Sequence, residues 1–207
     1  MSSLAARRGE GGALLLVGAF IAALAIGSTT GEASQYCWSP AALQDWLSGT
    51  GSASEAVLEP AAVAWLLTSD LWHLLAVSVA IVVAARAVVQ RLGTLRFLLF
   101  AAIQGILFSS LGVVVRLGAA GAGERLAGAS GTTWALLGSA LLLEIRRERL
   151  ARPALAVTGL LVVQLIRPEG GPGAIGASDL PAVAQLAAFL GGPLLLPFFL
   201  PRARGGS

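Results

Sequence analysis

The sequence contains little charge and few of the residues that hold metal ions or form disulfides. Charged residues make up only 12% of the 207-residue chain, whereas 56% of it is hydrophobic. About a quarter of the residues of a soluble domain are usually charged. A single cysteine, Cys37, excludes a disulfide within the chain, and there is only one histidine. This composition places the chain in the membrane class.

Lysine is absent, so all fourteen basic residues are arginines. A basic excess often indicates nucleic-acid binding, but these arginines stand at the ends of apolar runs, where they set the orientation of membrane helices. We therefore expect the lipid bilayer, and no nucleic acid, as a partner. The sequence contains no phosphate-binding loop, dinucleotide fingerprint or cluster of metal ligands, so we expect no cofactor and no metal.

Apolar runs predict an all-α membrane protein that forms a single domain over residues 1–207. A helix needs roughly 20 mostly apolar residues to cross the hydrocarbon core. The first run is short enough to be the apolar part of a signal peptide, with residues 25–28 (AIGS) as a cleavage site, and this alternative stays open here. The six predicted spans are about 12–27, 72–89, 95–117, 130–145, 153–166 and 180–200.

Residues 28–71, between the first two runs, predict a long outer loop at the membrane interface. Trp38 and Trp46 stand near carboxylates, a combination typical of the headgroup level. Residues 61–67 (AAVAWLL) are apolar but too short to span, so they could lie in the interface. The sequence does not say whether residues 28–60 are ordered.

Arginine positions predict that both ends of the chain lie in the cytoplasm. With the N-terminus inside, eleven arginines fall at inner ends of the spans and three at outer ends, a clear positive-inside bias. The inner set is Arg7, Arg8, Arg86, Arg91, Arg96, Arg146, Arg147, Arg149, Arg152, Arg202 and Arg204, and the outer set is Arg116, Arg125 and Arg167.

Polar groups within the spans are costly and are the first candidates for function. Ser130 stands where a Gly-rich outer loop meets the fourth span, so the helix dipole could stabilise charge that develops there. The neighbouring Gly128 and Gly131 would let a substrate backbone approach, although a small-residue packing face has the same pattern. Gln104 is expected to form a hydrogen bond between helices. Ser178 or Asp179 would cap the sixth helix.

Residues 128–138 (GASGTTWALLG) resemble the signature of the rhomboid intramembrane serine proteases, with Trp134 as the aromatic residue four positions after the serine. Residues 72–75 (WHLL), 88–98 (VVQRLGTLRFL) and 184–192 (AQLAAFLGG) resemble three further rhomboid segments in the same order. The resemblance implies a rhomboid-like bundle, with Ser130 at the nucleophile position and His73 at the oxyanion site.

The departures from the rhomboid pattern bear on activity. The family's catalytic histidine falls on Gln185, and an amide cannot accept and return a proton near neutral pH. The asparagine that donates to the oxyanion falls on Val77, which has no side-chain donor. Gln185 is expected to form an interhelical hydrogen bond, with Ser130 as one candidate partner.

We therefore expect a divergent rhomboid without the catalytic histidine, in a bacterial inner membrane. It would bind transmembrane segments of client proteins at a cleft between the second, fifth and sixth helices without cleaving them. One alternative is an active protease that uses Ser130 with His73, and another is a structural or assembly subunit. Client identity and oligomeric state are not indicated by the sequence.

Overall fold

The computed structural model describes residues 2–30, 33–118, 125–145, 154, 156–161 and 180–201, and most of them are helical. Within these ranges the only β pairing is an isolated bridge between Trp38 and Leu126. The predicted all-α class is therefore confirmed for the described part of the chain. The predicted fifth span, 153–166, lies mostly outside it.

Three of the described helices are long and apolar enough to cross a membrane. They are α4 (Leu71–Leu92), α5 (Thr94–Gly118) and α8 (Ala182–Phe199). Shorter apolar helices are α6 (Ala129–Ile145) and the segment Gly11–Ala23 of α1 (Ser2–Thr30). The ends of α4, α5, α6 and α8 differ from those of the corresponding predicted spans by no more than three residues.

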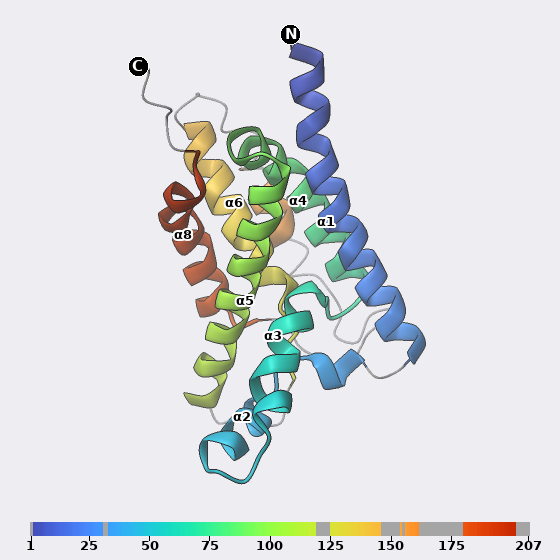
Figure 1. Ribbon diagram of the computed structural model, residues 1–207, viewed down its shortest axis with the longest axis vertical. Coiled ribbons are helices and arrows are strands. Elements are labelled where there is room, and N and C mark those ends of the chain that lie inside the picture. The colour runs from blue at the N-terminus through green and yellow to red at the C-terminus, as the bar shows by residue number, and fades with distance from the viewer. Residues whose placement is uncertain are drawn as a thin grey trace.

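Helix α6 is the centre of the bundle, with α4, α5 and α8 packed around it (Figure 1). Every residue from 129 to 140 is buried. Leu136 and Leu137 are fully enclosed, which is the pattern of a helix that is apolar on all sides. Ser130 thus begins the most enclosed helix of the described bundle.

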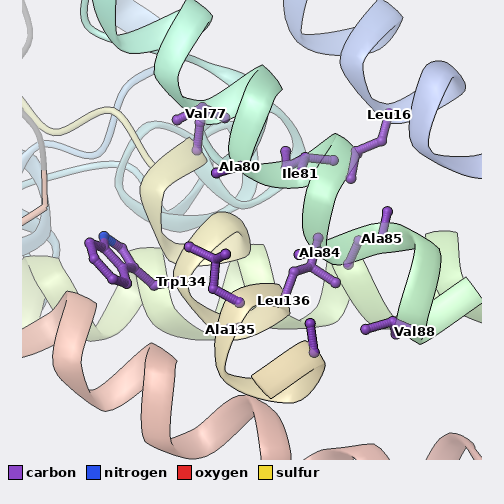
Figure 2. Packing of buried hydrophobic residues seen from close by; sticks show 14 of the residues in the cluster. Leu16, Val77, Ala80, Ile81, Ala84, Ala85, Val88, Trp134, Ala135 and Leu136 are labelled. Atoms are coloured by element: carbon purple, nitrogen blue, oxygen red, sulfur yellow. The ribbon is translucent and has the colours of Figure 1, made fainter. Parts of the chain in front are cut away.

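Helix α1 packs against the outer side of α4. Its buried face carries Ala13, Leu16 and Phe20, and Leu16 approaches Ile81 and Ala85 of α4 (Figure 2). The helix is longer than the predicted span 12–27, because the flanking Ala, Leu, Arg and Glu residues favour a helix although they are not all apolar.

A capping side chain and a glycine set the two ends of α4. Asp70 caps its first turn by accepting a hydrogen bond from the His73 backbone N–H. Gly93 ends the helix with a φ of 77°, a conformation that favours glycine, and α5 begins at the next residue. The sharp turn returns α5 across the bundle.

Residues 33–66 form five short helical segments, so the predicted loop has regular structure. They are η1 (Ala33–Tyr36), α2 (Pro40–Leu47), the π-helix η2 (Ser54–Leu58), α3 (Glu59–Val63) and η3 (Ala64–Leu66). The Trp38 ring is buried within the protein, and its indole N–H donates to Ser109 Oγ at 2.9 Å. The Trp46 side chain is partly exposed.

Helices α6 and α8 approach each other closely through glycines. A Cβ on Gly138 would overlap the Phe189 carbonyl, and one on Gly192 would overlap the Ala135 carbonyl. Pro193 cannot donate to the carbonyl four residues earlier, so the Phe189 carbonyl lacks its usual helical donor and faces Gly138. Small residues thus bring α8 against the central helix.

Candidate functional site

Ser130 lies in the first turn of α6, and two backbone hydrogen bonds hold the chain just before it. The Gly128 N–H donates to the Ala64 carbonyl at 2.9 Å, and the Ala129 N–H donates to the Leu67 carbonyl at 3.1 Å. Residues 67–70 lead directly into α4. The beginnings of α4 and α6 are therefore held side by side.

The Ser130 side chain is fully buried, and its Oγ has no hydrogen-bond partner among the described residues. Thr68 Oγ1 and Trp134 Nε1 are in the same condition. Thr68 follows Leu67, whose carbonyl holds Ala129, and Trp134 lies one turn after Ser130 on α6. Buried polar groups usually have partners, so unsatisfied ones mark positions where water or a ligand group would be favourable.

Packing requires a glycine at position 128, because a Cβ there would lie 2.7 Å from the Ser109 Cβ. A Cβ on Gly131 would lie 3.2 Å from Leu180 Cδ1, a tight contact with the end of a side chain. Trp134 packs edge-to-face on Phe189 of α8, with the ring centres 6.1 Å apart.

His73 lies in the first turn of α4, where two neighbours contact it. Its Nδ1 is 3.2 Å from Ser69 Oγ, and its backbone N–H donates to Asp70 Oδ1 at 2.8 Å. The Ser69 hydroxyl also donates to Asp70 Oδ2 at 3.4 Å. All three residues are buried. The sequence identified His73 as a candidate residue but did not predict that Ser69 contacts its ring. Ser69 lies four residues before His73, and at the start of a helix this spacing does not determine whether the two side chains meet.

Gln185 lies in the first turn of α8 and bonds within its own segment. Its side-chain Nε2 donates to the Leu180 carbonyl at 2.9 Å. The interhelical hydrogen bond that we considered for Gln185 and Ser130 is absent, because Ser130 Oγ has no partner among the described residues. Helix α8 begins at Ala182, and its N-cap residue Pro181 has no side chain that could accept from the first turn. The suggested cap residues, Ser178 and Asp179, lie outside the described residues.

Two other positions complete the surroundings. Val77, one turn after His73, is buried and points toward α6, so it presents an apolar group there (Figure 2). Gln104 of α5 is buried, but neither atom of its amide has a hydrogen-bond partner among the described residues. The predicted interhelical hydrogen bond of Gln104 is therefore wrong within the described structure.

The segment between α1 and α2 carries a buried thiol, Cys37. Burial raises the pKa of Cys37 to about 12, and the positive charge of Arg125 partly opposes this shift. The Arg125 guanidinium donates to the Ser34 carbonyl and joins the loop before α6 to the segment after α1. In the described ranges no group of three His, Cys, Asp or Glu residues could hold a metal ion.

Comparison with known families gives one finding. The model of the rhomboid domain matches residues 61–202, which is more than half of the chain. The match covers α4, α5, α6 and α8 together with the contacts of Ser130, His73 and Gln185. Comparisons with curated proteins and with solved structures give no significant match.

Proposed function

The chain belongs to the rhomboid family and is an integral membrane protein, and from this premise we propose that it is a rhomboid pseudoprotease. It binds transmembrane segments of client proteins and does not cleave them. The proposal rests on Gln185, which stands where the family pattern has its catalytic histidine and which donates to Leu180 instead of contacting Ser130.

Proton transfer is the step that this arrangement lacks. A serine hydroxyl is a weak nucleophile until a base within hydrogen-bond distance removes its proton. A glutamine amide does not titrate near neutral pH. Val77 also offers no donor to a developing oxyanion, and removing one such donor typically lowers kcat by a factor of about 100 to 1,000. Both losses lower hydrolysis without removing the surfaces that bind a helix.

We further propose six spans with both termini in the cytoplasm of a bacterium, the chain lying in the inner membrane. The arginine distribution supports this orientation. The contact between α1 and α4 supports a first helix that is retained, because Leu16 and Phe20 are buried against the bundle.

Client binding needs an apolar surface beside the serine pocket. Helices α4 and α8 both pack on α6, and each leaves a stripe of large apolar side chains exposed. On α4 the stripe includes Leu75 and Val79, and on α8 it includes Leu186 and Leu190. A client helix that enters between these stripes would replace lipid and would approach Ser130 through the side of the bundle.

Site-specific photocrosslinking tests this binding. A photoreactive residue replaces Leu75 of α4 or Leu186 of α8 in protein reconstituted with a labelled rhomboid-type transmembrane peptide. The matched control is Leu99 of α5, which is exposed to a similar extent, 54% against 50% for Leu75. We expect crosslinks from Leu75 and Leu186 that unlabelled peptide suppresses. Equal crosslinking from Leu99 would contradict a specific lateral site.

A second candidate is an active protease that uses Ser130 with His73. One observation favours it: Ser69 and Asp70 contact His73 in the way that supporting groups orient a catalytic base. No hydrogen bond joins His73 to Ser130 Oγ in the described structure, so a client would have to bring the two together.

A further inference from the structure

We propose that Ser69 and Asp70 are positioning residues that fix His73 as the tautomer with its proton on Nδ1. The lone pair then lies on Nε2, so His73 accepts a hydrogen bond at this nitrogen and does not donate one to an oxyanion. This inference rests on the proposed function, because it assigns a chemical role to a residue of the same site.

The direction of the hydrogen bonds follows from Asp70. The Ser69 hydroxyl donates its one proton to Asp70 Oδ2, 3.4 Å away. The same hydroxyl oxygen is 3.2 Å from His73 Nδ1. Having used its proton, Ser69 accepts from His73, which requires the proton on Nδ1.

The orientation of Asp70 is itself fixed. Its other oxygen, Oδ1, accepts from the His73 backbone N–H at 2.8 Å and caps α4. The cap and the bond to Ser69 use different oxygens, so one carboxylate holds both the backbone and, through Ser69, the ring of the same residue. Ser69, Asp70 and His73 are at most 4% exposed, so water competes little with these bonds.

The tautomer decides whether His73 can donate a hydrogen bond to an oxyanion or can only accept one at Nε2. Stabilising an oxyanion requires a donor on the nitrogen that faces it. A neutral imidazole with its proton on Nδ1 instead presents an acceptor on Nε2. In a pseudoprotease this acceptor would receive an N–H or O–H group of the bound client segment.

The single histidine of the chain makes the tautomer directly measurable. Protein labelled with ¹⁵N-histidine and reconstituted in lipid has one imidazole, and its protonated and unprotonated nitrogens differ widely in ¹⁵N chemical shift. The measurement is made at about pH 8, above the ordinary histidine pKa of about 6.5. We expect a proton on Nδ1 and none on Nε2.

Two substitutions and one control test whether Asp70 and Ser69 determine the tautomer of His73. Asp70→Asn keeps a residue that caps helices well, but its amide N–H would donate to Ser69, which then donates to Nδ1 and moves the ring proton to Nε2. Ser69→Ala should give a mixture of both tautomers. Ser78→Ala, on the same helix but away from the ring, should leave the spectrum unchanged.

Three results would overturn the inference: a wild-type proton on Nε2, a doubly protonated ring at this pH, or an Asp70→Asn spectrum like that of the wild type. Helix content by circular dichroism identifies a variant that fails to fold, and the wild-type spectrum decides the tautomer without any variant. The crosslinking test of client binding does not depend on the tautomer, so the failure of either proposal is seen separately.

Discussion

The side-chain amide of Gln185 donates to the Leu180 carbonyl, 2.9 Å away, and so joins the first turn of α8 to the segment that precedes the helix. Leu180 in turn packs near Gly131, the neighbour of Ser130, and near Gly112 of α5. Gln185 therefore supports the packing around the serine without contacting its hydroxyl. The hydrogen bond of the Gln185 side chain is thus a structural contact within its own segment.

The close approach of α6 and α8 depends on Gly138. We expect Gly138→Ala to destabilise the protein by about 1–3 kcal/mol or more, because the added methyl group meets the Phe189 carbonyl, which cannot move without its helix. Thermal unfolding in detergent measures the change. Gly18→Ala is the matched control, because a Cβ there has no neighbour within 4 Å and a helical alanine gains about 0.5–1 kcal/mol over glycine. Equal effects of the two changes would refute the tight packing.

The hydrogen bond between Trp38 and Ser109 joins the segment between α1 and α2 to α5. Ser109→Ala leaves the buried indole N–H unpaired, so we expect a loss of about 1–3 kcal/mol. Ser110→Ala is the control, because among the described residues the Ser110 hydroxyl donates only to carbonyls of its own helix. Denaturant unfolding followed by tryptophan fluorescence compares them. A Ser110→Ala variant as unstable as Ser109→Ala would contradict the role of Trp38.

Cys37 should resist thiol reagents in the folded protein. Its raised pKa keeps the thiol protonated near pH 8, and only the thiolate reacts. Because the folded pKa, about 12, lies above the reference value of 9.0, this group favours the folded state below pH 9.0 and loses that contribution as the pH rises toward 12. Maleimide labelling before and after denaturation measures the reactivity.

The control for Cys37 is a cysteine at the exposed position Ser52 in a Cys37→Ala background. We expect this thiol to react at the ordinary rate in the folded protein, whereas Cys37 reacts only after unfolding. Fast labelling of Cys37 in the folded state would show that the segment between α1 and α2 is open.

The bounds of α4, α5, α6 and α8 could be predicted within a few residues, because length and apolarity alone determine a membrane helix. The family could be predicted because its short motifs keep their order along the chain. The partners of polar side chains could not. Trp38 finds Ser109 71 positions later in the sequence, and hydropathy carries no information about such a contact.

The residues around Ser130 show the same difference between what the sequence could predict and what it could not. The sequence identified Ser130, His73 and Gln185 as residues of interest, but it suggested an interhelical bond where Gln185 has a local one. The Leu180 carbonyl is only five residues before Gln185 and lies within reach of the first turn of α8. The sequence did not single out Ser69, and only the helix start defined by Asp70 brings it to the ring of His73.

Placing an imidazole at position 185 tests whether the surroundings of Ser130 still support its reactivity. We expect Gln185→His to give slow labelling of Ser130 by a fluorophosphonate, because a base would then stand at the family's position. Gln185→Asn, which is also an amide, is the matched control and should give none. If His73 already serves as the base, Gln185→His would instead leave existing labelling unchanged or abolish it.

The most direct test is the reactivity of Ser130 in the unmodified protein. Purified protein in lipid is incubated with a fluorescent fluorophosphonate and, separately, with rhomboid-type transmembrane substrates, beside the Ser130→Ala variant. We expect neither labelling nor cleavage above the level of that variant. Labelling or cleavage that disappears in Ser130→Ala would contradict the pseudoprotease assignment and would establish an active protease.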